Sequence, residues 1–266
     1  MSKQADTFRR LHEGPTILVL PNAWDAASAA MMEDAGAKAV ATSSAALAWA
    51  HGYADGDILP IPTLLSALGE ISRVLKVPLT ADIEGGYSDD LATLGDTIRG
   101  VIDAGAVGIN FEDGGRPRDL HARKIETARE VAAKSGVPLF VNARIDVYLR
   151  GLAEGAPALA ETLERAELYR AAGADGIFVP GPTDETLLET LAREIALPLN
   201  VMGRGGMAPA SKLQALGVRR LSSATAPFRA AYGALARAVE TYLADGDPAA
   251  LAEAGKGAPD LNKRFG

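Results

Sequence analysis

The sequence predicts a closed (β/α)8 barrel of the TIM type, followed by an additional C-terminal helix and a tail. Eight short β-rich runs alternate with segments of helical period, and they span residues 16–20, 38–42, 77–82, 106–111, 137–142, 174–179, 197–202 and 218–222. Strands that alternate with helices form parallel sheets with right-handed crossovers. An open doubly wound sheet has the same local pattern and is the alternative, but eight regularly spaced units fit closure better.

A weak internal repeat supports this number of strands. The third, fifth and seventh runs open with VPL, VPL and LPL, 60 residues apart each time. The even-numbered runs are preceded by DAGA, DAGA, AAGA and ALGV. In each of these we expect the glycine to end a helix in the left-handed conformation, at Gly36, Gly105, Gly173 and Gly217. The recurrence at every second unit indicates a barrel with a two-unit periodicity.

Length and composition fit one large core and exclude several classes of protein. The chain has 266 residues, 48% of them hydrophobic, and barrels of about 250 residues form one domain. A net charge of −7 argues against nucleic acid, whose binders usually carry a basic stripe. No run approaches the roughly 18 apolar residues of a membrane span, and MSKQADTFRR lacks a signal-peptide core. We therefore expect a cytoplasmic protein with no membrane partner.

The expected domain organisation follows from the C-terminal part of the chain. Residues 228–244 have the pattern of a long amphipathic helix. We assign residues 1–244 to a single barrel domain that includes this helix. Residues 245–266 are expected to form a short helix and a polar tail, which either caps the barrel or reaches a neighbouring subunit.

Acidic side chains follow two neighbouring strands of the predicted barrel. Asp82 and Glu84 follow the third run, and Glu112 follows the fourth. Because the active site of such a barrel lies at the carboxyl ends of its strands, we expect these acids to lie close together. There is no cysteine in the chain and no histidine at these ends, so an oxygen-ligated Mg²⁺ is expected, with Mn²⁺ as the alternative. The competing interpretation is that the acids cap helices or pair with Arg144 and Arg116.

Other polar groups are expected at the same mouth. Arg144 follows the fifth run and is suited to clamp a carboxylate or phosphonate with two parallel hydrogen bonds, unless it forms a structural ion pair with Glu112 or Asp113. The SSA segment 43–45 offers hydroxyl and N–H groups to an anion, or is an ordinary helix cap. Asn200, in the seventh run, is a further candidate for substrate binding. GRGG at 203–206 lies where many barrels bind phosphate, although a flexible turn fits it better.

Six stretches together resemble the isocitrate lyase/phosphoenolpyruvate mutase superfamily, over residues 15 to 240. They are PNAWDAASA, TSSAALAWAHGYAD, TADIEGGY, GINFEDG, NARID and PFRAAYGAL. The combination of D-x-[DE]-x-G-Y, EDG and AR-x-[DE] after successive strands is specific, whereas each motif alone is weak. Within the superfamily the chain is similar to short-loop proteins of the carboxyphosphonoenolpyruvate phosphonomutase and 2-methylisocitrate lyase type.

The resemblance implies an Mg²⁺-dependent enzyme that stabilises the enolate of a 2-oxo acid. It implies Asp82 as the principal metal ligand, with Glu84 and Glu112 acting through water. Ser43, Ser44 and Ala45 would receive the substrate carboxylate. It also implies two catalytic residues, Arg144 as a clamp and Asp55 near the reacting bond. The family forms oligomers through its C-terminal helices, so a homodimer or homotetramer is expected.

The chain departs from the family between the fourth and fifth strands. Isocitrate and methylisocitrate lyases carry a K-[KR]-C-G-H segment with an acid–base cysteine, but EDGGRPRDLHARKIETARE here is short and cysteine-free. Proton transfer would then fall to Asp55 or to a water molecule. Arg116, Arg118 and His121 in this interval are expected to be surface residues.

These observations leave three functions open for a small carboxylate ligand. The first is a lyase that cleaves a C–C bond, as in oxaloacetate decarboxylation or methylisocitrate cleavage. The alternative is P–C bond chemistry on a phosphonopyruvate-like substrate, by a phosphonomutase or phosphonopyruvate hydrolase. The third is a non-catalytic barrel that binds a small acid.

Overall fold

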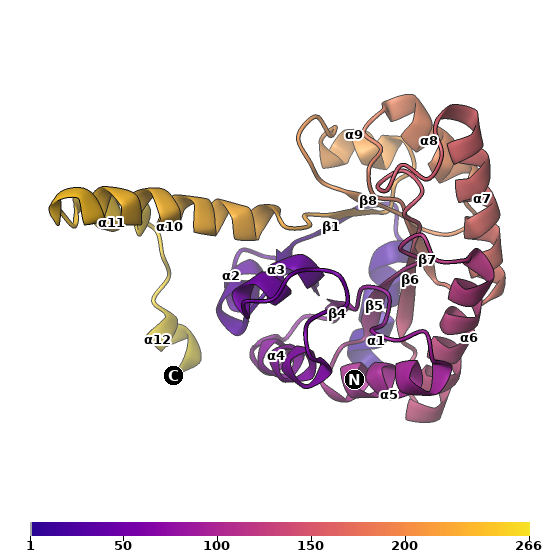
Figure 1. Ribbon diagram of the computed structural model, residues 1–266, viewed down its shortest axis with the longest axis horizontal. Coiled ribbons are helices and arrows are strands. Elements are labelled where there is room, and N and C mark those ends of the chain that lie inside the picture. Colours follow the sequence, from indigo (N-terminus) through magenta and orange to yellow (C-terminus); the bar gives the residue numbers. More distant parts are fainter. Residues whose placement is uncertain (1) are drawn as a thin grey trace.

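The computed structural model describes residues 2–266 and confirms the predicted (β/α)8 barrel (Figure 1). Each expected strand run contains a strand, and the strands are β1 (Leu18–Leu20), β2 (Asn22–Ala23), β3 (Val40–Thr42), β4 (Leu79–Asp82), β5 (Gly108–Glu112), β6 (Phe140–Arg144), β7 (Gly176–Phe178), β8 (Leu199–Met202) and β9 (Arg220–Ser222). All pairings between neighbours are parallel.

The sheet closes through its first strand, which is divided in two. Proline at position 21 separates β1 from β2, because it has no N–H to continue the ladder. β1 pairs with β9, and β2 pairs with β3. The strand order is β1-β9-β8-β7-β6-β5-β4-β3-β2. Its two end strands, β1 and β2, are consecutive in the chain, so the barrel is closed there by the backbone itself.

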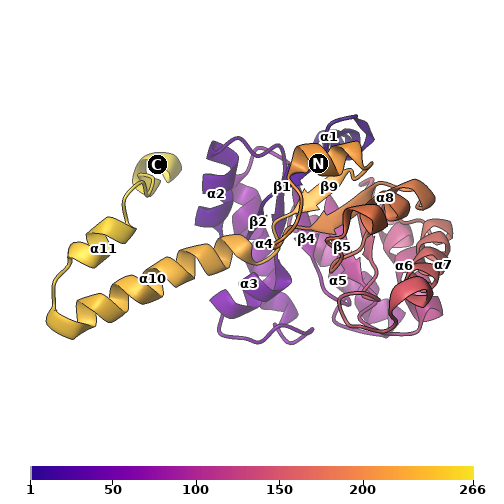
Figure 2. The same ribbon diagram turned by 90° about the horizontal axis from the view of Figure 1, so that it is seen from above.

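Most of the helices cover the outside of this sheet, whereas the first lies at its amino end and the long C-terminal helix extends away from it (Figures 1 and 2). They are α1 (Ser2–Glu13), α2 (Ala26–Asp34), α3 (Ser44–Ala50), α4 (Ile61–Val74), α5 (Leu91–Asp103), α6 (Arg118–Ser135), α7 (Gly155–Ala171), α8 (Glu185–Glu194), α9 (Ala210–Ala215), α10 (Ala226–Asp245), α11 (Ala249–Ala254) and α12 (Leu261–Phe265). The four glycines of the repeat have φ between 94° and 104°, as predicted, at Gly36, Gly105, Gly173 and Gly217. They turn the chain from each helix into the next strand.

Helix α1 packs against the end of the barrel opposite the candidate site. Its Phe8 is fully buried and packs edge-on against Phe140, the first residue of β6. Arg9 pairs with Asp175, just before β7, at 2.8 Å. Since both partners lie at the amino ends of strands, α1 covers that mouth of the barrel.

The C-terminal helix α10 extends away from the barrel (Figures 1 and 2). After α11, the chain returns to the body of the molecule through α12, where the sequence analysis expected only a polar tail. Arg264 of α12 bonds Asp34 at 3.0 Å and Glu33 at 2.9 Å, both on α2. The tail is therefore tied to the barrel by ion pairs that a local pattern does not reveal.

Candidate active site

A cavity of about 150 Å³ lies at the carboxyl ends of the strands. Six of the residues expected at the site line it: Ser43, Ser44, Ala45, Asp55, Asp82 and Arg144. Eight further residues, which were not assigned to the site from the sequence, complete the lining: Asn22, Asn110, Leu149, Phe178, Met202, Ser222, Ala224 and Thr225. Three other expected residues do not line the cavity but contact residues that do: Glu84 bonds Asp82, Glu112 pairs with Arg144, and Asn200 bonds Ser222.

Asp82 presents its carboxylate at the end of β4. Its N–H donates to the Thr42 hydroxyl at 2.8 Å, and its Oδ1 accepts from the Glu84 N–H at 3.1 Å. Burial raises the pKa of Asp82 to about 6, although Arg144 and the Glu84 N–H oppose the rise. Asp55, on the other side of the cavity, adds to the rise. This carboxylate is therefore short of positive charge.

Arg144 is held by two carboxylates at the end of β6. Its NH1 pairs with Glu112 at 2.5 Å, and its Nε and NH2 donate to the two oxygens of Asp146 at 2.7 and 3.1 Å. The structural ion pair with Glu112 is thus present, and Arg144 lines the cavity as well. Burial raises the pKa of Glu112 to about 8, so Arg144 and Arg150 together do not offset the loss of water around this acid.

Glu84 faces the loop that follows α3. Its Oε2 accepts from the N–H groups of Gly56 and Asp57, and its Oε1 accepts from the Tyr87 hydroxyl at 3.0 Å. Burial raises the pKa of Glu84 to about 7, with contributions from Asp55 and Asp82. Glu84 therefore touches the segment that carries Asp55.

The acids do not form a compact metal-binding cluster by themselves. Among residues 2–266, no three acidic, histidine or cysteine side chains are grouped so as to hold a metal ion directly. The oxygen-only donors and raised pKa values nevertheless fit Mg²⁺, which often takes one or two direct carboxylates and retains several waters. Of the three acids expected to hold the cation, Asp82 is the one that lines the cavity.

Polar side chains beneath the cavity form a connected network. Arg220 is fully buried, and it donates to Asn110 Oδ1 at 3.0 Å and to the Ser222 hydroxyl at 3.3 Å. Ser222 in turn donates to Asn200 Oδ1 at 3.0 Å. Asn200 therefore does not line the cavity itself but contacts Ser222, which does. Burial lowers the pKa of Arg220 to about 9, and Asp82 partly offsets this. A charged residue inside a strand run was the available signal in the sequence.

The SSA segment caps α3, and its three residues also line the cavity. Ser43 is the N-cap residue, and its hydroxyl oxygen accepts from the Ala46 N–H at 3.4 Å. The cap and the anion site, alternatives in the sequence, are therefore compatible in space. On the other side, Leu149, Phe178 and Met202 form an apolar wall.

Three other residues named from the sequence lie outside the cavity. Arg204 of GRGG donates to the Gly181 carbonyl at 3.3 Å, away from the lining. Arg118 pairs with Glu164 at the surface, as expected. His121 was expected at the surface, and this was wrong: it is fully buried between Phe111 and Tyr169. Its position on the inner face of α6 explains the difference.

Fold and site define a barrel enzyme with acids and one arginine at its strand ends. The family model described as phosphoenolpyruvate phosphomutase matches residues 8–243. The chain therefore belongs to this family, within the isocitrate lyase/phosphoenolpyruvate mutase superfamily of lyases and mutases.

Individual relatives within this family have different names. An uncharacterized Mycobacterium tuberculosis protein is 35% identical over 91% of this chain and 90% of its own length. Oxaloacetate decarboxylase of Pseudomonas fluorescens is 27% identical over 80% of this chain and 75% of its own. The crystal structure of 2,3-dimethylmalate lyase has a TM-score of 0.82 at 25% identity, covering 92% of this chain and 89% of that chain. The relatives share the family, but the two enzymes among them are named for different reactions.

No helix in the described part of the chain has both the length and the apolar character needed to cross a bilayer.

Proposed function

We propose that this protein is an Mg²⁺-dependent carbon–carbon lyase that acts on a small 2-oxo or 2-hydroxy carboxylate through a metal-stabilised enolate. The observation that carries the proposal is the convergence of Asp82, Arg144 and segment 43–45 on one cavity of about 150 Å³. This volume is below the roughly 300–1,000 Å³ of common ligand sites, so it favours a ligand of a few non-hydrogen atoms. Oxaloacetate decarboxylation is the simplest such reaction, and methylisocitrate-type cleavage is a larger variant.

Asp82 would hold the cation directly, and Glu84 and Glu112 would act through water. When bound, the cation would supply fixed positive charge that stabilises the negative charge developing on the enolate oxygen. The pKa values of about 6, 7 and 8 support this assignment, because desolvation of the three acids outweighs the positive charge near them and so favours a cation. Mn²⁺ would satisfy the same oxygen donors.

The side chains around the cavity have separate roles in this proposal. Arg144 clamps the substrate and stabilises negative charge that develops during cleavage. Ser43, Ser44 and Ala45 receive the substrate carboxylate, and Asn200 orients Ser222 at the floor through their 3.0 Å hydrogen bond. Asp55, which lines the cavity from its loop, protonates the enolate carbon after carbon dioxide has left a 2-oxo acid, or removes the hydroxyl proton when a 2-hydroxy acid is cleaved.

The cavity favours C–C over P–C chemistry. A phosphonate carries up to two negative charges and needs several donors. Among the described residues, Arg144 is the one cationic side chain that lines the cavity, and Arg204 lies outside it. Leu149, Phe178 and Met202 offer phosphonate oxygens no partner, and the polar residues of the lining other than Arg144 and the two acids carry no charge: Asn22, Ser43, Ser44, Asn110, Ser222 and Thr225. P–C cleavage is therefore the second candidate.

A product assay separates these functions. The protein with Mg²⁺ would be incubated separately with oxaloacetate, 2-alkylmalates and phosphonopyruvate, and pyruvate, other 2-oxo acids, phosphoenolpyruvate and inorganic phosphate would be measured. We expect 2-oxo acid from a substrate of the first two classes, and neither phosphate nor phosphoenolpyruvate from the third. Release of phosphate by hydrolysis, or formation of phosphoenolpyruvate by rearrangement, would overturn the proposal in favour of P–C chemistry, and binding without any product would favour a non-catalytic barrel.

Self-association through α10 is also part of the proposal. On α10, Tyr232, Leu235 and Leu243 are 44%, 50% and 76% exposed, and their offsets of three and eleven residues bring them to one face. Val19 of β1 is 55% exposed beside an apolar groove between α2 and the end of β9. The extended α10 of a second copy has the apolar face to cover such a groove, which gives a homodimer or a homotetramer. A cytoplasmic location stays a prediction.

A further inference from the structure

Two loops at the mouth of the barrel are joined by reciprocal hydrogen bonds. One is the α3–α4 connection, residues 51–60, which carries Asp55, and the other is the β4–α5 connection, residues 83–90. We propose that Asp57 is a positioning residue that, together with Glu84, fastens these loops and so holds Asp55 at the cavity. The role assigned to Asp55 rests on the proposed function, whereas the fastening itself does not.

Glu84 supplies one half of the fastening, which we call the clasp (Glu84 with Asp57). Its Oε2 accepts from the N–H of Gly56 at 2.7 Å and from the N–H of Asp57. These two N–H groups directly follow Asp55 in the chain. The Glu84 N–H also donates to Asp82 Oδ1 at 3.1 Å. The clasp thereby connects the backbone next to Asp55 with the acid expected to hold the cation.

Asp57 supplies the other half in the opposite direction. Its Oδ1 accepts from the N–H groups of Gly85 and Tyr87, each at 3.1 Å. A carboxylate that accepts from two N–H groups of another loop fixes both its own backbone and that loop. The exchange is reciprocal, because each acid binds the backbone around the other.

Basic residues hold Asp57 from the outer side. The NH2 group of Arg116 donates to Asp57 Oδ2 at 2.9 Å, and its Nε donates to Asp89 at 3.0 Å. Lys124, whose side chain is fully buried, donates to Asp89 and to the Gly85 carbonyl, the latter at 2.9 Å. Three charged side chains thus brace the clasp, which is more than an isolated surface loop requires.

Backbone geometry indicates that the clasp is built at a conformational cost. Asp57, Glu84 and Tyr87 have backbone φ angles of 60°, 52° and 62°, which residues other than glycine rarely adopt. Such strain persists where surrounding contacts over-determine it, often at functional sites. Gly85 is also constrained, because a Cβ there would collide with the Arg116 guanidinium and lie 2.8 Å from Asp57 Oδ2.

The consequence concerns Asp55, which is exposed on its loop and still lines the cavity. Anchors lie on both sides: the Tyr53 N–H donates to the Ala48 carbonyl at 2.9 Å, and the clasp fixes Gly56 and Asp57. Without the clasp, the segment 54–57 would lose its anchor on one side. Asp55 would then leave the reacting bond for part of the time, while Asp82 and Arg144 would keep their places.

The test compares Asp57→Ala, Asp57→Asn and a matched control, Asp96→Asn. Asp96 forms an exposed ion pair with Arg99 on α5. Among the described residues, no contact of this pair involves a residue of the clasp. Hydrogen exchange would be measured at residues 54–57, with kcat, KM and Mg²⁺-dependent oxalate affinity in the same proteins. The Asn variant keeps an acceptor oxygen for the loop N–H groups and loses the charge that pairs with Arg116.

In Asp57→Ala we expect exchange at residues 54–57 to rise by about tenfold or more. We expect kcat to fall by about 10- to 100-fold while oxalate affinity changes by less than about threefold, since oxalate does not need Asp55. Asp57→Asn should lie between, and Asp96→Asn should match the wild type. Unchanged exchange in a folded Asp57→Ala variant would overturn the proposal, as would faster exchange with unchanged kcat. Absence of oxalate binding in the wild type would instead overturn the proposed function, and exchange would still test the clasp.

Discussion

At the scale of single residues, Asp82 and Arg144 combine roles that the sequence presented as alternatives. Arg144 pairs with Glu112 at 2.5 Å and also lines the cavity. Asp82 could be identified because the residue at the end of a barrel strand faces the mouth. Arg220 and Asn110 could not, because a short run such as VRRLS does not reveal which side chains point into the barrel. Asp57 was missed because its partners are 27 to 59 residues away in the chain.

The raised pKa of Asp82 predicts how pH changes stabilisation by Mg²⁺. The folded value of about 6 exceeds the unfolded value, so the metal-free folded protein binds more protons than the unfolded chain between about pH 4 and 6. Stability from this group therefore falls as pH rises through that window. Mg²⁺ binds the carboxylate form, so its stabilisation should be larger at pH 8 than at pH 5.

Thermal unfolding with and without Mg²⁺ checks this at both pH values. Asp82→Asn removes the buried charge, and we expect it to raise the metal-free Tm at pH 8 by about 2–5 °C and to abolish the Mg²⁺ effect. Equal stabilisation by Mg²⁺ at pH 5 and pH 8 in the wild type would contradict the assignment.

Arg144→Lys should weaken Mg²⁺-dependent oxalate binding by about 10- to 100-fold, because an ammonium does not replace a bidentate fork. Arg150→Lys is a matched control: Arg150 pairs with the same acids, Glu112 at 3.5 Å and Asp146 at 3.0 Å, but does not line the cavity. We expect that control to bind oxalate within about twofold of the wild type. Calorimetric titration of both variants decides the matter, and equal losses would assign Arg144 a structural role.

At the scale of elements, the strands were predictable and the first and last helices were not fully so. The VPL and glycine repeats mark the strands because every unit uses the same turn chemistry. The role of α1 depends on Phe8 reaching Phe140, a contact across 132 residues that local periodicity does not encode. For α12, the ion pairs of Arg264 with α2 have the same long-range character.

Phe8→Ala tests the role of α1 as a cover for the amino-terminal mouth. The side chain is fully buried, and truncation of such a phenylalanine costs about 3–5 kcal/mol of the free energy of unfolding. Urea unfolding would measure this loss. Mg²⁺-dependent oxalate affinity at low temperature should stay within about twofold, because the cavity lies at the other mouth. A loss of affinity without a loss of stability would contradict this separation.

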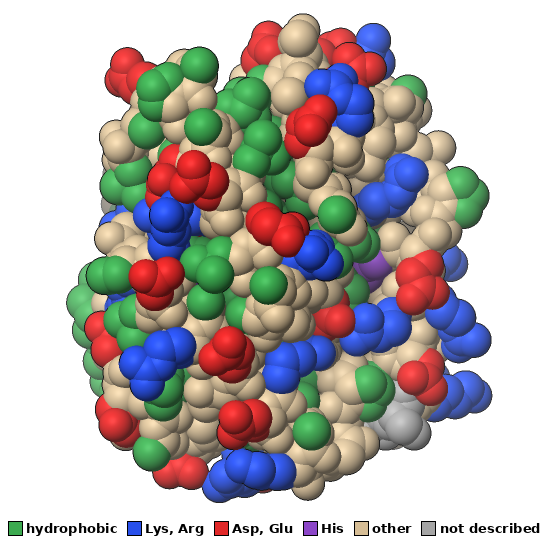
Figure 3. Space-filling model, turned by 90° about the vertical axis from the view of Figure 1, so that its right-hand side faces the viewer, with side chains coloured by type: hydrophobic (Ala, Val, Ile, Leu, Met, Phe, Trp, Pro, Cys, Tyr) green, Lys and Arg blue, Asp and Glu red, His purple; other side chains and the backbone are tan. Residues whose placement is uncertain are grey.

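At the scale of the whole molecule, α10 and the charge distribution bear on partners. Acidic and basic side chains are interspersed over the face in Figure 3. Helix α10 ends at Asp245, where Gly246 adopts φ of 80°, close to the expected end of the barrel domain. The division into residues 1–244 and 245–266 stays a prediction. The direction of α10 was not predictable, because amphipathic period does not say which surface the helix covers.

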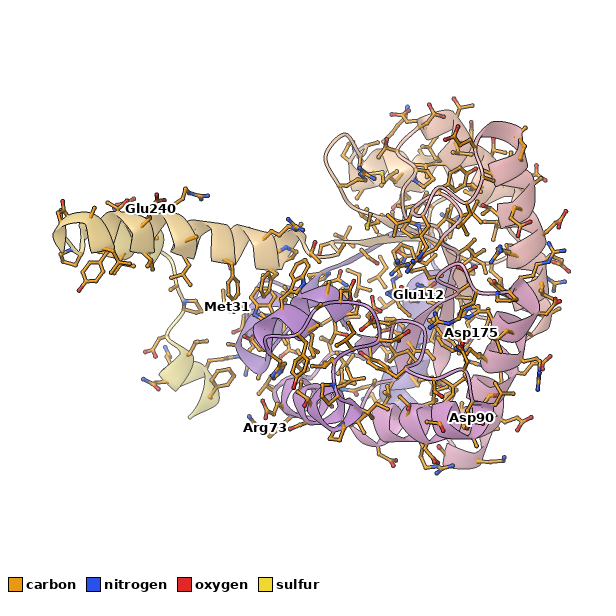
Figure 4. The ribbon with its side chains drawn as sticks, in the orientation of Figure 1. Met31, Arg73, Asp90, Glu112, Asp175 and Glu240 are labelled. Atoms are coloured by element: carbon orange, nitrogen blue, oxygen red, sulfur yellow. The ribbon has the colours of Figure 1, made fainter. Side chains whose placement is uncertain are left out.

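Leu235→Glu should disrupt self-association, because it puts a charge on the apolar face of α10. Glu240→Gln is a control on the same helix, and Glu240 lies on the side of α10 away from α12 (Figure 4). Light scattering after size exclusion should give a dimer or tetramer for the wild type and the control, and a shift toward monomer for Leu235→Glu. A monomeric wild type at micromolar concentration would contradict the proposed oligomer.

The central claim is that Asp82 and Arg144 bind an enolate-like acid together with a divalent cation. The most direct measurement is calorimetric titration of oxalate, a planar mimic of pyruvate enolate, into the wild type and Asp82→Asn with and without Mg²⁺. We expect binding by the wild type that requires Mg²⁺, and loss of that binding in a folded Asp82→Asn variant. Oxalate binding that is independent of Mg²⁺ or unaffected by Asp82→Asn, or no binding at all, would contradict the account.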